Sequence, residues 1–284
     1  MSKIALLTDS TSYIPAEYVK KYNITILPQV VIWDGVTYED GVDIQPDEFY
    51  ARLKTAKNMP TTSQVSIAKM QQTFSRLLGE GYEVLGIFLS EKLSGTIQSA
   101  LQAREHLETG KDKVHIVDSG TTIMSLGFQV IAAARALENG ADIAGAKTAA
   151  EAARAATGVF FAVDTLEFLH RGGRIGGAQR FIGSALNLKP ILTISNGRVE
   201  AVERIRTKAK AHDRIIELVV EQCKGKSPIR IAAQHAAAEE DAQALLEKVK
   251  AQVEVTESMI APVSAVIGTH VGPGTVALAF VAGV

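Results

Sequence analysis

Short runs of β-branched and apolar residues alternate with segments of helical periodicity along the chain, and this alternation limits the fold more than any other feature. Strands are predicted in the first half at residues 3–8, 24–33, 83–89 and 113–117. Helices are predicted between and after them at residues 15–21, 46–57, 66–78, 96–107 and 122–138. Parallel strands need a long crossover connection, which is usually a helix. The N-terminal half is therefore expected to form an α/β domain with a parallel sheet.

The pattern restarts after an alanine-rich helical segment at residues 142–156. Further strands are predicted at residues 158–164, 190–195, 198–204, 229–234, 253–260 and 275–281, with helices at 208–222 and 239–251. Asn196-Gly197 predicts a two-residue hairpin, which makes this second sheet mixed, and Asp34-Gly35 predicts a hairpin that decorates the first sheet. We expect two α/β domains, residues 1–156 and 157–284, packed closely enough to form a cleft.

Composition excludes several classes of protein. The formal net charge of −1 over 284 residues lacks the basic excess that a nucleic-acid partner requires. Cys223 is the only cysteine, so an internal disulfide and a thiolate-rich metal site are both excluded. The apolar stretch at residues 123–137 is shorter than the roughly 20 residues of a membrane-spanning helix. The N-terminal apolar run, residues 4–7, is too short for a signal peptide, and a cytoplasmic protein is expected.

Three polar segments stand where a helix is predicted to begin. They are Asp9-Ser10-Thr11-Ser12, Pro60-Thr61-Thr62-Ser63-Gln64 and Ser90-Glu91-Lys92-Leu93-Ser94-Gly95-Thr96. In open α/β sheets, ligands bind beyond the carboxyl ends of the strands. Such helix starts can hold a carboxylate or phosphate with hydroxyls and backbone N–H groups. Ordinary helix capping explains each segment equally well when it is taken alone.

His270 is the most distinctive of the six histidines, because Gly272-Pro273-Gly274 forces an irregular turn beside it. A surface histidine next to a turn is the alternative. No histidine pair has the spacing of a zinc protease, so no metal site is predicted.

The segment His170-Arg171-Gly172-Gly173-Arg174-Ile175-Gly176-Gly177 is glycine-rich but matches neither a Walker loop nor a dinucleotide fingerprint. No cofactor is therefore predicted. Two arginines on a glycine frame suit phosphate or carboxylate recognition. A solvated loop that caps the preceding helix is the alternative.

The residues alone are also compatible with two hypotheses in which the protein is an enzyme. Ser94 and His270 occur together with several aspartates, as a lipid hydrolase would need, although Ser94 lacks the G-x-S-x-G elbow that exposes a nucleophile. The loop from Arg171 to Gly177 is the corresponding candidate for a small-molecule phosphotransferase. Both stand as alternatives to a binding protein.

Taken together, the motifs resemble one known family over essentially the whole chain. The matching blocks are Asp9-Ser10, residues 38–44 with 48–50, Thr62-Ser63-Gln64, Leu93-Ser94-Gly95-Thr96, Asp118-Ser119, Leu169 with residues 172–175, residues 189–192, and His270 with Gly272-Pro273-Gly274. In this order and spacing they resemble the DegV family, the fatty-acid-binding subunits of bacterial fatty-acid kinase.

The resemblance implies the two-domain DegV-like (EDD) α/β fold, with the lipid tail buried between or beneath the domains. It implies that Thr62, Ser94 and His270 bind the carboxylate, with Ser63 and the backbone of Gly95 as further candidates. Val65 departs from the family pattern Thr-Ser-Gln-Pro.

The resemblance also implies a substrate-binding subunit without its own catalysis. Its partners would be a long-chain fatty acid and the catalytic subunit of a fatty-acid kinase, and transient contact with a membrane surface is compatible with that role. We assign Arg171 and Arg174 to docking on the kinase, because an arginine clamp would neutralise the carboxylate that attacks phosphate.

Overall fold

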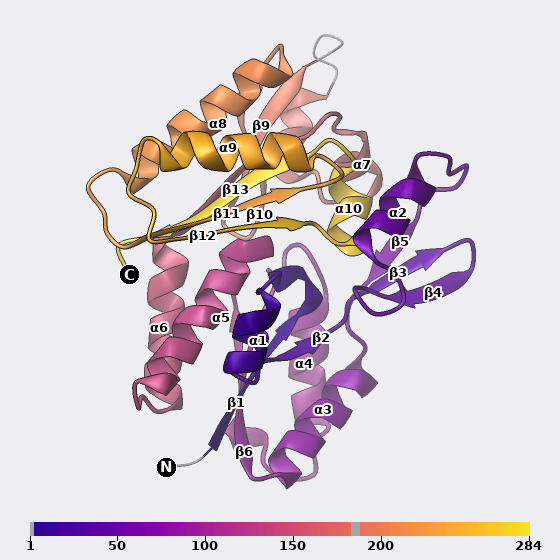
Figure 1. The fold of residues 1–284 in the computed structure, drawn as a ribbon. Helices are drawn as coiled ribbons and strands as arrows, with labels where there is room; N and C mark the ends of the chain where they lie inside the picture. Colours follow the sequence, from indigo (N-terminus) through magenta and orange to yellow (C-terminus); the bar gives the residue numbers. More distant parts are fainter. Residues whose placement is uncertain (1–2, 183–187) are drawn as a thin grey trace. The chain divides into compact units, whose positions relative to one another are not determined.

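The computed structural model describes residues 3–182 and 188–284, so Met1 and Ser2, which precede the first apolar run, lie outside it. The chain divides into two compact units (Figure 1). Unit 1 comprises Met1–Val30 and Thr62–Ala155, and unit 2 comprises Val31–Thr61 and Ala156–Val284. The segment 31–61 thus belongs to unit 2, whereas the sequence analysis had assigned it to the N-terminal domain.

Unit 1 is built on a four-stranded parallel sheet with the order β2-β1-β6-β7. Its strands are β1 (Lys3–Asp9), β2 (Thr25–Leu27), β6 (Tyr82–Phe88) and β7 (Val114–Asp118). The predicted parallel sheet is confirmed. From β1 the chain moves outward to β2 and later returns to β6 on the other side, so the direction of winding reverses between β1 and β6.

Helices cover both faces of this sheet (Figure 1). They are α1 (Ala16–Lys21), α3 (Ile67–Gly79), α4 (Thr96–Glu105), α5 (Ile123–Glu138) and α6 (Ile143–Ala156), with short 3-10 turns η1 (Ser10–Ser12) and η2 (Lys111–Lys113). Helices α3 and α4 pack on the face that carries Leu7, Val84 and Phe88. Because side chains alternate along a strand, Leu6 and Leu85 point to the opposite face, where α5 contacts β1 and β6.

Unit 2 contains a six-stranded mixed sheet with the order β10-β9-β8-β13-β11-β12. Its strands are β8 (Thr157–Ala162), β9 (Lys189–Ser195), β10 (Arg198–Ile205), β11 (Ile229–His235), β12 (Glu257–Pro262) and β13 (Val276–Ala282). β11 and β12 are parallel, and the other neighbouring pairs are antiparallel. Asn196 and Gly197 have φ angles of 49° and 81°, which a two-residue hairpin turn requires. The predicted mixed sheet and its hairpin are confirmed.

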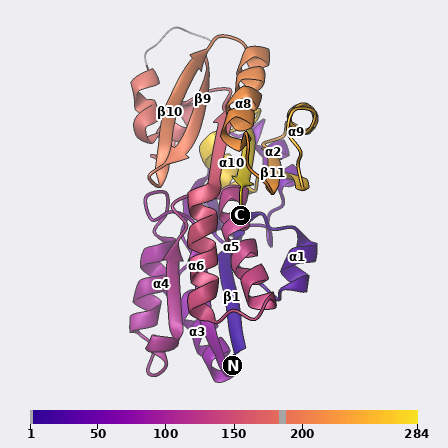
Figure 2. The ribbon, with the colours of Figure 1, turned by 90° about the vertical axis from the view of Figure 1, so that its left-hand side faces the viewer.

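One face of this sheet is covered by two long helices, α8 (Lys208–Cys223) and α9 (Glu239–Lys250). Ile215 of α8 and Leu245 of α9 share a core with Ile231 and Leu278 of the sheet. Figure 2 shows α8 alongside β9 and β10. The remaining short helices of unit 2 are α7 (Glu167–Arg171), η3 (Gly176–Phe181) and α10 (Ala265–Val271).

The segment 31–61 carries most of a small three-stranded sheet with the order β4-β3-β5, together with one helix. These elements are β3 (Val30–Trp33), β4 (Val36–Glu39), α2 (Pro46–Leu53) and β5 (Thr61–Ser63). Asp34 and Gly35 form the predicted hairpin turn with φ angles of 49° and 78°. The sequence analysis had expected this hairpin to decorate the parallel sheet. Instead, its strands pair within the small sheet β4-β3-β5.

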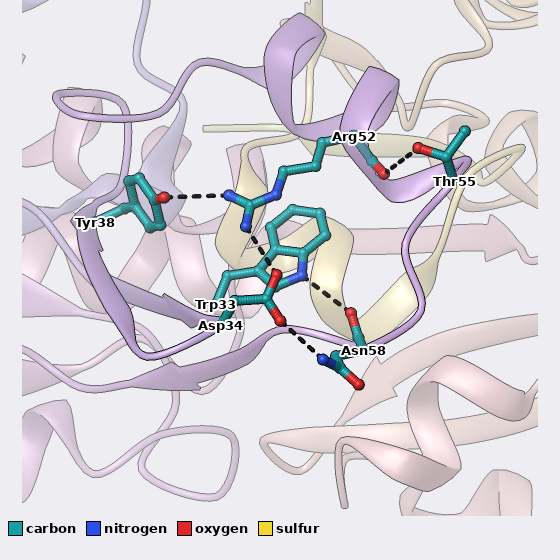
Figure 3. A network of polar contacts seen from close by, with 6 residues as sticks. All are labelled: Trp33, Asp34, Tyr38, Arg52, Thr55 and Asn58. Atoms are coloured by element: carbon teal, nitrogen blue, oxygen red, sulfur yellow. Dashed lines mark hydrogen bonds and ion pairs between the residues drawn. The ribbon is translucent and has the colours of Figure 1, made fainter.

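A polar network ties α2 to this hairpin (Figure 3). The Arg52 guanidinium lies over the Trp33 ring, 4.2 Å from its centre, and donates hydrogen bonds to Asp34 at 3.0 Å and to Tyr38 at 3.1 Å. The indole N–H of Trp33 donates to the Asn58 carbonyl at 3.0 Å. A buried tryptophan needs a partner for its N–H, and this contact closes the segment on itself.

Several elements differ from the sequence-based expectation, among them strand β5, which was not predicted. The run at residues 24–33 forms two strands, because Pro28 interrupts it and proline has no N–H for a sheet ladder. The strand expected at 253–260 begins only at Glu257. Helix α10 was not predicted, since it has seven residues and includes Gly268 and β-branched side chains that weaken the helical signal. Within the described ranges, no helix is both long and apolar enough to cross a membrane.

Candidate ligand-binding site

The reversal of winding between β1 and β6 fixes the most favourable place for a ligand in unit 1. The segment after β1 begins with η1, and the segment after β6 contains Ser90 and Ser94. Both follow the carboxyl ends of adjacent parallel strands, so they meet at the same edge of the sheet. Ligands of open α/β sheets bind at this kind of position.

Asp9 is the buried centre of this edge. One of its carboxylate oxygens accepts from the backbone N–H and the hydroxyl of Thr11, at 3.0 and 2.6 Å, and the other accepts from the Leu89 N–H at 2.8 Å. The Thr122 hydroxyl donates to that of Thr11 at 2.8 Å. Burial raises the pKa of Asp9, while the hydrogen bonds from Thr11, Leu89 and Gln29 oppose this rise. Asp9 thus joins the β1 and β6 segments.

Ser94 lies beside a second polar pair in the same unit. Its hydroxyl oxygen is 3.1 Å from that of Thr96, the first residue of α4. The Gln29 side-chain amide donates to the Thr96 hydroxyl at 2.8 Å. Thr96 and Gln29 are buried, whereas Ser94 is partly exposed. The partly exposed Ser94 hydroxyl therefore contacts buried Thr96, which in turn is hydrogen-bonded to buried Gln29.

The Thr62 segment lies next to the Ser94 segment. A side chain at Gly95 would crowd the side-chain amide of Gln64, so the two segments approach closely there. Thr62 and Ser63 are both partly exposed. Unit 1 therefore brings together the four residues that the sequence analysis assigned to carboxylate binding on this side, Thr62, Ser63, Ser94 and Gly95.

His270 lies on helix α10 of unit 2, whose start is held by the segment 31–61. The Asp40 carboxylate accepts from the Ser264 hydroxyl at 2.7 Å and from the Val266 N–H at 3.2 Å, which caps the helix. The Tyr50 hydroxyl donates to the Val263 carbonyl at 3.1 Å. These contacts explain why 31–61 packs with unit 2.

The imidazole of His270 is largely buried against the glycine-rich loop. A side chain at Gly172 would collide with its Nδ1, so glycine is needed for this approach. Burial, followed by the neighbouring Arg174 charge, lowers the pKa of His270 to about 4. His270 is therefore neutral near pH 7 and can donate one N–H. The alternative of an exposed histidine beside a turn does not fit this burial.

The depressed pKa of His270 gives a testable pH dependence of stability. At a pH between the unfolded-state pKa of about 6.5 and the folded-state pKa of about 4, His270 binds a proton only in the unfolded chain. The contribution of His270 to folding stability is therefore complete above about pH 6.5 and is lost as the pH falls toward about 4. Lipid-free protein should lose about 2 kcal/mol of unfolding free energy through His270 between about pH 7.5 and about pH 5. Urea denaturation of wild type and His270→Gln would check this, and equal pH slopes would contradict it.

The two arginines of the glycine-rich loop have different surroundings. Arg171 is exposed and forms an ion pair with Glu167 at 2.5 Å on α7. Arg174 is half-buried near His270, and its guanidinium donates to the Gly172 carbonyl at 2.8 Å. Only Arg171 has the exposure that the sequence analysis expected of both.

The second half of this loop packs against the hairpin of β9 and β10. Side chains at Gly176 and Gly177 would collide with the Val199 carbonyl and the Glu200 carboxylate, respectively. Oxygen atoms therefore face these glycines, which is an unfavourable setting for a phosphate. Among residues 3–182 and 188–284, no group of three or more histidine, cysteine, aspartate or glutamate side chains is arranged to hold a metal ion.

The sequence analysis missed two residues that organise these sites, Gln29 and Asp40. Gln29 stands two residues after β2 and lies 67 positions from its partner Thr96. Asp40 is 224 positions from Ser264, although it falls within the quoted block 38–44. A long polar side chain beside Pro28, within a mostly apolar run, was the available signal for Gln29.

Residues 3–283 match the family model of the DegV family, whose description is that of an uncharacterised protein. The chain belongs to the DegV family. A DegV domain-containing protein of Streptomyces coelicolor is 37% identical to this chain over 273 residues, which cover 95% of both proteins.

Two solved DegV structures show the same fold over nearly their full length. A DegV family protein from Thermus thermophilus, described as fatty-acid binding, is 36% identical, with a TM-score of 0.93 and 99% of both chains covered. DegV of Bacillus subtilis, described as a fatty acid binding protein, is 34% identical, with a TM-score of 0.88 and coverage of 99% of this chain and 100% of that one. The expected α/β DegV fold is confirmed.

Proposed function

We propose that this DegV protein binds one long-chain fatty acid in a buried tunnel and presents its carboxylate to an ATP-dependent fatty-acid kinase, which forms the acyl phosphate. The observation that carries the proposal is the set of partly exposed hydroxyls of Thr62, Ser63 and Ser94 near the sheet edge of unit 1 where the winding reverses. Two relatives of this chain are described as fatty-acid binding. Hydroxyl and backbone donors can hold a carboxylate without a neutralising ion pair.

The head group is bound by Thr62 and Ser94, with Ser63 and the Gly95 backbone N–H as further donors. His270 is assigned to the same carboxylate by the family resemblance. Its low pKa makes it a neutral donor near pH 7, so it offers a hydrogen bond without a full opposing charge. The carboxylate then keeps its negative charge for attack on the γ-phosphate of ATP.

Affinity comes mainly from the acyl tail. At ~0.8 kcal/mol for each buried methylene, a tail of about fourteen contributes roughly 11 kcal/mol before the cost of association. One hydrogen bond to a charged group is worth about 1.5–3 kcal/mol. The polar residues therefore determine orientation more than affinity.

The kinase would dock on the loop that carries Arg171 and Arg174. Arg171 is the exposed member, and its side chain is 59% accessible. A basic side chain at the rim of a binding protein can pair with an acidic partner surface and accelerate encounter.

Protein purified from a bacterial host should contain one fatty acid per chain, because an apolar tunnel rarely stays empty. Native mass spectrometry before and after denaturing extraction measures the bound mass and releases it for identification. Protein that carries no lipid, and that no fatty acid of any length stabilises, would overturn the proposal.

The same preparation distinguishes the enzymatic alternatives. The partner of the Ser94 hydroxyl in unit 1 is the Thr96 hydroxyl, which cannot act as the general base of a hydrolase. We expect no turnover of aryl esters and no consumption of ATP by the protein alone. Turnover of either substrate without a partner would favour a hydrolase or a phosphotransferase.

A further inference from the structure

The buried polar groups behind Ser94 form a chain that leads back to Asp9. Gln29 is 1% exposed and Thr96 is fully buried. Gln29 receives support at its backbone as well, since its N–H donates to the Ser10 hydroxyl at 3.1 Å. Burying a primary amide is costly unless its hydrogen bonds are made. Hydrogen bonds to Ser10 at the backbone and to Thr96 at the side chain therefore fix the position of Gln29.

The orientation of the Gln29 amide follows from Asp9. Burial raises the pKa of Asp9, but its oxygens accept three hydrogen bonds from Thr11 and Leu89 and a further one from the Gln29 side chain, and each of these stabilises the ionised, acceptor-only form. The NH₂ end of Gln29 must therefore face Asp9. That end carries two protons, and its nitrogen is also 2.8 Å from the Thr96 hydroxyl, whereas the amide oxygen is 3.2 Å away.

The direction of donation then continues to Ser94. Thr96 accepts from the Gln29 NH₂ group, and its own proton is directed to the Ser94 oxygen at 3.1 Å. The Gln29 amide oxygen, at 3.2 Å, is the other acceptor within reach of the Thr96 proton, and the Ser94 oxygen at 3.1 Å is the acceptor on the exposed side. Ser94 accepts from Thr96, so its single proton is available to an acceptor on its exposed side.

We propose that Gln29 and Thr96 are positioning residues for Ser94, which orient its hydroxyl as a donor toward the carboxylate of the ligand. The inference rests on the proposed function, since it concerns the same head group. The inference extends that function, because it assigns a role to two buried residues that the head-group assignment does not include.

The test compares Thr96→Val, which removes the hydroxyl at nearly constant volume, with the conservative variant Thr96→Ser. Dissociation constants for palmitate and for methyl palmitate are measured near neutral pH. Thr96→Val should weaken palmitate binding by about fivefold to tenfold, because a misdirected donor loses part of a charge-assisted hydrogen bond. Thr96→Ser should restore affinity to within about twofold. Methyl palmitate, which has no charge, should bind all variants almost equally.

A double-mutant cycle with Ser94→Ala shows whether Thr96 acts through Ser94. Once Ser94 is alanine, Thr96→Val should cause no further loss of palmitate affinity. An equal loss in both backgrounds, or failure of Thr96→Ser to restore binding, would overturn the inference.

Two further results separate this inference from the proposed function. If Ser94→Ala weakens palmitate binding but Thr96→Val does not, the inference alone fails. If Ser94→Ala has no effect on palmitate binding or on kinase turnover, the head-group assignment fails and the inference fails with it. Thermal unfolding checks that each variant folds, and Thr96→Ala, with the same expected loss, replaces Thr96→Val if valine prevents folding.

Discussion

Ser94→Ala protein is expected to lose most acyl-phosphate formation with its kinase while still carrying fatty acid. The tail contributes roughly 11 kcal/mol of gross burial energy, and the lost hydrogen bond costs about 1.5–3 kcal/mol, so lipid stays bound at working concentrations. Phosphoryl transfer, however, requires the carboxylate oxygen in line with the phosphate, and misplacement by about 1 Å can cost ~100-fold in rate. Turnover with ATP and the partner kinase, measured beside lipid content by native mass spectrometry, checks this result.

Thr62→Ala and His270→Ala are expected to behave in the same way, with turnover falling more than binding. Ser66→Ala is the matched control, because it also removes a hydroxyl at a helix start. Ser66 caps α3 by accepting from the Lys69 N–H at 3.2 Å, so its loss should cost about 1 kcal/mol of stability and leave turnover unchanged. Full turnover by Thr62→Ala, Ser94→Ala and His270→Ala alike would refute the head-group assignment.

The parts of the fold that were predictable from sequence depend on local signals. The hairpin at Asn196-Gly197 was predictable because its left-handed backbone angles suit asparagine and glycine. The parallel sheet followed from the alternation of strand and helix patterns. Asp9 combines a local cap with a long-range contact, since it accepts from Thr11 in η1 and also from the Leu89 N–H after β6.

The missed features depend on contacts between residues that are far apart in sequence. The segment 31–61 joins unit 2 through Tyr50 and Asp40, whose partners lie more than 200 positions away, and no local pattern shows this. Arg171 and Arg174 look equivalent in the glycine-rich loop, yet one is exposed and the other half-buried. Arg174 lies near His270, which packs against Gly172, and sequence spacing alone does not reveal this contact.

That difference changes how docking on the kinase should be tested. Reversing both arginines would place a carboxylate near His270 at position 174 and so disturb the proposed head-group residue. Arg171 carries the test better, because its side chain is 59% accessible and its partner is Glu167. An exposed ion pair of this kind contributes little to stability, about 0–1 kcal/mol, so its loss should leave the fold intact.

Arg171→Glu is expected to reduce turnover with the kinase by about tenfold or more at low ionic strength, because reversed charge opposes an acidic docking surface and slows encounter. The loss should shrink as salt is added, since salt screens charges separated by more than ~10 Å at about 0.1 M. Lipid content and thermal stability should stay unchanged. Lys248→Glu is the matched control, because Lys248 is also 59% accessible and forms an ion pair, but it lies on α9. Equal losses of turnover in both variants would show that the effect comes from net charge alone. Normal turnover of Arg171→Glu would place the docking surface elsewhere. Loss of lipid from Arg171→Glu would assign Arg171 to the binding site.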